Sequence, residues 1–131
     1  MRRSLRRVPA LMGAALLIGL GVSGSAAAKP ATGDFPDRLL VTAREFDLTL
    51  SKPKVQAGDA IVELYDFGED PHDLRIQRVG GPTIYSISEV LPEEIGRVEM
   101  RFRKASRYRL WCSLANHAEL GMVAALRTSK R

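Results

Sequence analysis

The sequence is poor in cysteine and histidine, with one cysteine and two histidines among 131 residues. A single cysteine excludes a disulfide within the chain and leaves either a free thiol or one half of an intermolecular disulfide. Long apolar runs are also missing, because the stretch from Ala10 to Val22 is too short for a transmembrane helix, which needs roughly 20 residues. Internal repeats and long low-complexity tracts are absent, and the length suits a single domain.

The first 28 residues predict a signal peptide. Four arginines open the chain, the apolar run follows, and small residues ending at Ala28 provide a cleavage site. The protein is therefore expected in the periplasm or outside the cell. Export uses the Sec route or, since Arg2 and Arg3 resemble a twin-arginine signal, the Tat route; the alternative is an uncleaved anchor. A lipid anchor at this point is excluded, because no cysteine follows the apolar run.

The positive charge of the chain lies mostly in this leader. The whole chain has 20 Lys and Arg against 15 Asp and Glu, and subtracting the leader's four arginines leaves 16 against 15, or +1. We therefore expect no nucleic-acid partner, because the basic excess that such a partner requires is missing. Residues 29–38 are expected to be a flexible lead-in broken by glycine and proline, and residues 39–131 a single domain.

The expected domain has a hydrophobic period of two, which is typical of strands with one buried face. Phe46, Leu48 and Leu50 alternate with polar residues. Further strands are expected in residues 61–67, 72–79, 98–103, 108–112 and 122–128. Short strands separated by turn signals indicate an all-β sandwich or barrel. Residues 80–96 are ambiguous, because a short strand, a helical turn or a loop fits their pattern.

The strand pattern brings four potential metal ligands to one end of the core. His72 shares an inward face with the apolar residues two and four positions later, and Cys112 ends another strand on its inward face. His117 and Met122 follow in a loop that is short enough to fold back over the same point. Two imidazoles and a thiolate with a weak axial thioether form the type 1 (blue) copper site of electron-transfer proteins. The predicted metal ligands are therefore His72, Cys112, His117 and Met122.

Each of these side chains also has a purely structural interpretation. An inward histidine can be a hydrogen-bonded core residue, and a buried cysteine can act as a small apolar side chain. Met122 can belong to the core, as we expect of Met100. The order and spacing of the four residues together favour copper over these alternatives.

Two segments resemble the cupredoxins, the small blue copper proteins that include plastocyanin and azurin. "DPHDLRI" is similar to the region of their first histidine, and "CSLANHAELGM" is similar to their Cys-His-Met loop. "KVQAGDAIVELYDFGEDPHDL" and "YRLWC" resemble the strands that lead into these ligands. The resemblance spans about residues 44–128 and implies a Greek-key β-sandwich with one type 1 copper that transfers single electrons. It makes His72, Cys112 and His117 the equatorial ligands and Met122 the axial ligand.

The sequence departs from the cupredoxin pattern beside the ligands. Asp73 stands where asparagine is frequent, and we expect its carboxylate to accept a hydrogen bond from Ser113 or a loop amide. Its negative charge should favour Cu(II). Ala115 and Asn116 replace a common Pro-Gly pair, and we expect Asn116 to take the left-handed conformation. None of these changes removes a ligand.

The resemblance predicts a monomeric electron carrier and not an enzyme, because both histidines are used and none remains for a second copper centre. The alternatives are a protein for copper storage, sensing or delivery, and a metal-free sandwich used for adhesion. Redox partners are expected to dock at an apolar patch around His117, or beside Trp111, where arginines fall on outward positions. Trp111 can instead be an apolar anchor of the outer face. The predicted basic patch consists of Arg101, Arg103 and Arg109, with Lys104 and Arg107 in the turn between their strands.

Overall fold

The computed structural model describes residues 35–130, so the predicted signal peptide and most of the predicted lead-in lie outside the described residues. The described part of the chain forms nine strands and no helix. It accordingly contains no helix that is long and apolar enough to cross a membrane. The first strand begins at Asp37, two residues before the expected start of the domain.

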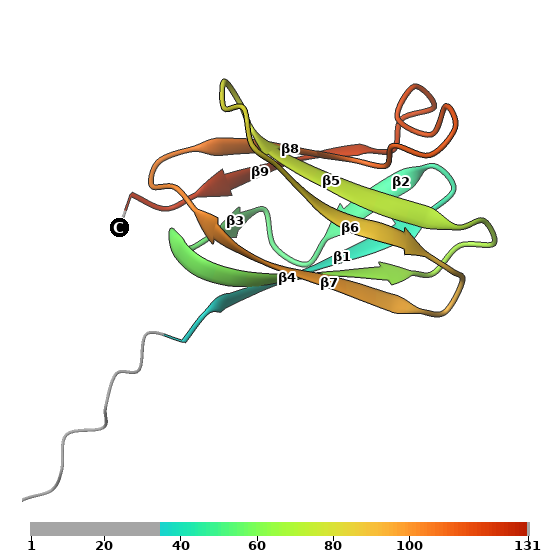
Figure 1. Cartoon of the computed structure of the whole chain (residues 1–131), viewed down its shortest axis with the longest axis horizontal. Coiled ribbons are helices and arrows are strands. Elements are labelled where there is room, and N and C mark those ends of the chain that lie inside the picture. Colours follow the sequence, from blue (N-terminus) through green and yellow to red (C-terminus); the bar gives the residue numbers. More distant parts are fainter. Residues whose placement is uncertain (1–34, 131) are drawn as a thin grey trace, which may run out of the picture. The chain divides into compact units, whose positions relative to one another are not determined.

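The strands form two sheets that pack face to face, as Figure 1 shows. One sheet has the order β2-β1-β4-β7 and contains β1 (Asp37–Arg44), β2 (Asp47–Leu50), β4 (Gly58–Asp66) and β7 (Ile95–Phe102). The other sheet has the order β3-β9-β8-β5-β6 and contains β3 (Lys54–Val55), β5 (His72–Arg78), β6 (Ile84–Val90), β8 (Arg107–Trp111) and β9 (Val123–Thr128). The predicted all-β sandwich is confirmed.

The core lies between the inward faces of the two sheets. Every second residue of β4 is buried from Ala60 to Asp66, and Tyr108, Leu110 and Cys112 share the inward face of β8 and its end. This alternation follows from the pleat of a strand, whose successive side chains point to opposite faces. The period-two pattern therefore predicts the buried residues correctly in these strands.

The alternation fails at Asp73, which the sequence places on the outward face of its strand. The structure buries this residue, with 1% of its surface exposed, between the buried His72 and Leu74. The pairing of β5 with β6 shifts register between His72 and Leu74, which marks a β-bulge or a similar irregularity. Bulges redirect side chains beside functional sites, and this one places the carboxylate next to His72 inside the protein.

The ambiguous segment 80–96 contains β6, which forms the edge of the five-stranded sheet. The strand was hard to predict because only Ile87 and Val90 of its seven residues are buried. Gly96, at the start of β7, lies directly against both of these side chains. A Cβ atom at Gly96 would come within 2.3 Å of Ile87 Cγ2. Glycine is therefore needed here to let β7 and β6 approach.

Candidate metal centre

Three of the four predicted ligands meet at one end of the sandwich. His72 is the first residue of β5, Cys112 directly follows β8, and His117 lies in the loop between β8 and β9. The two Nδ1 atoms of His72 and His117 are 3.3 Å apart. Cys112 Sγ lies 4.0 Å from Nδ1 of His72 and 3.5 Å from Nδ1 of His117. All three residues are buried, and their ligand atoms form a group that could hold a metal ion.

These distances fit a metal ion with three ligands in a plane. Metal bonds of about 2.0–2.3 Å to nitrogen and sulfur, arranged trigonally, separate neighbouring ligand atoms by about 3.6 Å. The observed separations of 3.3, 3.5 and 4.0 Å bracket that value. Two imidazole nitrogens and one sulfur are also the donor set of a type 1 copper plane. The residues present therefore fit a copper ion.

Met122, the fourth predicted ligand, is fully buried directly before β9. Its backbone N–H donates to the carbonyl of His117 at 3.0 Å, and its carbonyl accepts from the N–H of Cys112 at 3.2 Å. These two bonds fix the backbone of Met122 to that of both loop ligands. Axial coordination by its thioether stays a prediction.

The turn that carries His117 differs from the expected one. Ala115, and not Asn116, has the left-handed backbone, with φ at 41°. The N–H of His117 donates to the carbonyl of Leu114 at 3.1 Å, which closes the turn around Ala115. Asparagine tolerates this conformation better than alanine, and so the residue type alone pointed to the wrong position.

Asp73 links the strand of the first histidine to the loop of the cysteine. Its carboxylate accepts hydrogen bonds from the backbone N–H and from the hydroxyl of Ser113, each at 2.5 Å. Arg75 pairs with the same carboxylate at 3.1 Å and donates to the Ser113 hydroxyl at 3.1 Å. The expected hydrogen bond from Ser113 is confirmed. The residues next to His72 and Cys112 are thereby held together.

Burial raises the pKa of the Cys112 thiol above its usual range, and the nearby Asp73 carboxylate adds a smaller effect of the same sign. A buried thiol becomes a thiolate when a positive charge such as a metal ion lies beside it. The environment of Cys112 thus suits a metal ligand better than an exposed reactive thiol.

Glu45 is a site residue that the sequence did not reveal. It lies in the turn between β1 and β2, and its Oε1 atom is 3.3 Å from Nε2 of His72. Hydrogen bonds, first of all that from the backbone N–H of Asp70, lower the pKa of Glu45 to about 2. Glu45 and His72 are 27 residues apart and do not belong to a common motif. The sequence therefore contains no signal that pairs them.

The predicted basic patch beside Trp111 is wrong in part. Arg101 lies in β7 and Arg103 directly after it, in the four-stranded sheet, whereas Trp111 and Arg109 lie in β8 of the other sheet. Arg101 is also paired with Asp59 at 2.6 Å. Only Arg109 lies beside Trp111, with its guanidinium carbon 5.1 Å from the ring centroid. The alternating pattern shows that a residue points outward but not on which sheet it lies.

The sandwich has the cupredoxin fold, as comparisons with solved structures show. No protein-family model matches the chain, and no curated protein sequence matches it. Solved structures do match. Auracyanin A of Chloroflexus aurantiacus, described as a "blue" copper protein, has a TM-score of 0.59 at 14% identity, and the match covers 72% of this chain and 100% of that one.

A dithionite-reduced auracyanin of Roseiflexus castenholzii has a TM-score of 0.57 at 12% identity, with 70% of this chain and 96% of that chain covered. A multicopper oxidase also matches, with a TM-score of 0.51 at 19% identity. That match covers 71% of this chain but only 44% of the oxidase. The chain thus has the fold of blue copper proteins and corresponds to less than half of the larger enzyme.

Proposed function

We propose that the protein is an exported type 1 copper protein that carries single electrons between redox partners. The observation that supports this most is the buried triangle formed by Cys112 Sγ and the Nδ1 atoms of His72 and His117. These three residues would hold the copper ion, with the Met122 thioether as the fourth ligand. The bound ion supplies a one-electron Cu(II)/Cu(I) couple.

The chain itself keeps the ligand geometry constant and excludes water. His72, Cys112 and Met122 are fully buried, and 8% of the His117 surface is exposed. The bonds of Asp73 to Ser113 and of Met122 to its neighbours prevent the ligand loop from moving independently of β5. A site that does not rearrange between oxidation states exchanges electrons with a small reorganisation cost. This arrangement favours a carrier over a protein that releases its copper.

Copper storage, sensing or delivery is the competing function, since it can use the same ligands. A delivery site must exchange ligands easily, whereas this cluster is buried and held by the Asp73 bonds. Enzymatic turnover at further copper centres lacks ligands, because the two histidines of the whole sequence are both in the cluster. We therefore infer a carrier and not an enzyme.

Copper loading of the mature protein tests this function. One equivalent of Cu(II) should produce an intense thiolate-to-copper absorption band and an EPR spectrum with a narrow copper hyperfine splitting. Voltammetry should show a reversible one-electron couple with fast exchange, while a chelator removes the metal slowly. Slow electron exchange combined with rapid copper loss would instead indicate delivery, and the absence of binding would contradict any copper function.

Two surfaces offer routes for electrons to leave the site. The His117 ring lies beside the Phe46 ring, with centroids 4.9 Å apart, and Leu120 of the same loop is half exposed. The second route leads from Cys112 to its neighbour Trp111, which is half-buried and is the last residue of β8. An apolar patch fits the first route, whereas two arginines, Arg75 and Arg109, lie beside Trp111 on the second.

We call the second surface the basic face; it consists of four exposed cations on the outer side of the five-stranded sheet, Lys54, Arg107, Arg109 and Arg127. Arg127 is the register partner of both Lys54 and Arg107, which makes a row across three strands. Within residues 35–130 none of the four has an ion-pair partner, whereas Arg38, Arg97 and Arg101 of the other sheet are each paired. Of the four, Arg109 lies next to Trp111, and the other three continue the unpaired charge toward the start of β8. Such a face suits an acidic redox partner.

Charge reversal tests the basic face. The double variant Arg107→Glu/Arg109→Glu should slow electron transfer with an acidic redox protein by about 10-fold at low ionic strength, because steering is lost. Its salt dependence should also flatten. Stopped-flow kinetics measures both effects. The matched control is Arg97→Glu/Arg101→Glu, which changes the net charge equally on the other sheet. Equal slowing by both variants would show that the net charge of the protein, and not the basic face, determines the rate of electron transfer.

A further inference from the structure

We infer that Glu45 is a positioning residue for the first copper ligand, accepting the Nε2 proton of His72 and thereby leaving Nδ1 free for the metal. This inference rests on the proposed copper function. It adds to that function a carboxylate that orients one ligand and increases its donor strength.

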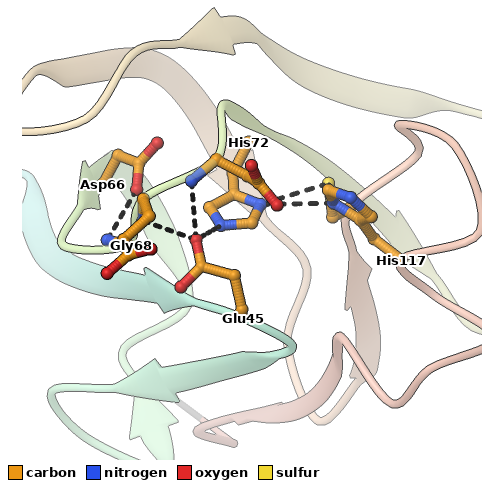
Figure 2. Close-up of polar contacts among 8 residues, drawn as sticks. Glu45, Asp66, Gly68, His72 and His117 are labelled. Atoms are coloured by element: carbon orange, nitrogen blue, oxygen red, sulfur yellow. Dashed lines mark hydrogen bonds and ion pairs between the residues drawn. The ribbon is translucent and has the colours of Figure 1, made fainter.

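The two edges of the His72 ring have different surroundings. Nδ1 faces the Nδ1 atom of His117 at 3.3 Å and the sulfur of Cys112 at 4.0 Å. Nε2 lies 3.3 Å from Oε1 of Glu45, as Figure 2 shows. The ring has no exposed surface, so water does not reach it. A histidine that binds a metal through one nitrogen carries its proton on the other, and the acceptor of that proton fixes the tautomer.

The carboxylate of Glu45 is itself held in place. Its Oε1 atom accepts the backbone N–H groups of Glu69 at 2.6 Å and of Asp70 at 2.8 Å, both from the loop that precedes His72. Gly68 of the same loop lies beside this carboxylate (Figure 2). It leaves room for it, because a Cβ atom at Gly68 would lie 2.2 Å from Oε1. The loop between β4 and β5 therefore fixes both His72 and the acceptor of its proton.

A carboxylate acceptor has a predictable effect on the metal. Hydrogen bonding to a negative oxygen makes the imidazole a stronger donor, which favours Cu(II) over Cu(I). Removing an outer partner of this kind typically costs 10–100-fold in metal affinity. Glu45 should therefore lower the reduction potential of the site, in the same direction as the expected effect of Asp73.

Three variants separate the hydrogen bond from the charge. Glu45→Gln removes the charge and weakens the acceptor. Gly68→Ala keeps the charge but displaces the carboxylate, because the new methyl group occupies its position and the end of the Glu45 side chain can move. Glu69→Gln is the matched control, since it removes an exposed carboxylate of the same loop that takes no part in the hydrogen bonds of His72 within the described residues. Each variant is compared with the wild type as apoprotein and with copper.

In the apoprotein, long-range ¹H–¹⁵N NMR reports the tautomer of His72. We expect the wild type and Glu69→Gln to hold the proton on Nε2, and Glu45→Gln and Gly68→Ala to give a mixture of tautomers. With copper, the last two variants should lose about 10-fold in affinity for Cu(II) relative to Cu(I). For one electron this corresponds to a potential that is about 59 mV higher. Glu69→Gln should change this affinity ratio less than twofold.

The inference is overturned if His72 keeps the same single tautomer in Glu45→Gln and Gly68→Ala. It is also overturned if Glu69→Gln raises the potential as much as Glu45→Gln, or if Gly68→Ala leaves it unchanged, since charge alone would then act. Failure of the copper function has a different signature. A chain that binds no copper but whose His72 tautomer still depends on Glu45 would refute the copper site and retain the positioning role.

Discussion

Cys112→Ser is expected to abolish the intense visible band of the copper-loaded protein and to widen its copper hyperfine splitting. The band arises from charge transfer between the thiolate and copper, and a serine hydroxyl provides neither the sulfur orbital nor the charge. The fold should survive, because the exchanged atom is one buried atom at the end of β8. Absorption and EPR spectra after addition of one equivalent of Cu(II) measure the effect.

Met122→Leu provides the control for this experiment. The substitution removes a thioether but preserves the size of a buried apolar side chain, which usually costs less than about 1.5 kcal/mol. The band should remain, and the potential should rise, because loss of a weak donor destabilises Cu(II) more than Cu(I). A band that persists in Cys112→Ser would contradict thiolate coordination, whatever Met122→Leu does.

Asp73→Ala is expected to destabilise the folded apoprotein by about 3 kcal/mol. The substitution leaves the N–H and hydroxyl of Ser113 without their acceptor and removes the partner of Arg75. Hydrogen bonds to a charged group contribute about 1.5–3 kcal/mol each. Ser113 and Arg75 are accessible to water, which replaces part of the lost contacts, so the expected loss stays below the sum of the individual bonds. Chemical denaturation of the apoprotein measures the change without any contribution from metal binding.

Asp73→Asn distinguishes the hydrogen bond from the charge. Asparagine keeps an oxygen that can accept the Ser113 N–H, so we expect a loss of only about 1 kcal/mol. In the copper-loaded protein the same variant should raise the potential, because it removes a negative charge close to the metal. Equal stability of the alanine and asparagine variants would show that the Asp73 bonds do not hold the two ligand segments together.

Periodicity in the sequence was enough to predict the sandwich, because strands with one buried face repeat every two residues. It also placed His72 and Cys112 on inward faces, where the structure has them. Spacing then placed His117 in the same loop as Cys112. These predictions concern local structure, in which the direction of a side chain follows from its own strand.

The features that were missed depend on contacts between distant segments. The burial of Asp73 arises from a register shift against β6, which alternation within one strand does not report. The approach of Glu45 to His72 joins a turn and a strand through tertiary packing alone. The division of the arginines between two sheets likewise depends on which strands pair. The hydrophobic pattern of a strand predicts which of its side chains point inward, but the pairing of strands determines which residues become neighbours.

Both ends of the described chain leave the sandwich on the side opposite to the metal cluster. β1 begins at Asp37 beside the start of β4, and β9 ends at Thr128 beside Val55; Figure 1 shows these two strand ends on the same side of the sandwich. The cluster lies at the other side, where β8 ends and β9 begins. A linker added after residue 130 would therefore tether the protein to an electrode with its redox-active tip pointing into solution. A fused domain attached there would likewise not block the approach of a partner to His117.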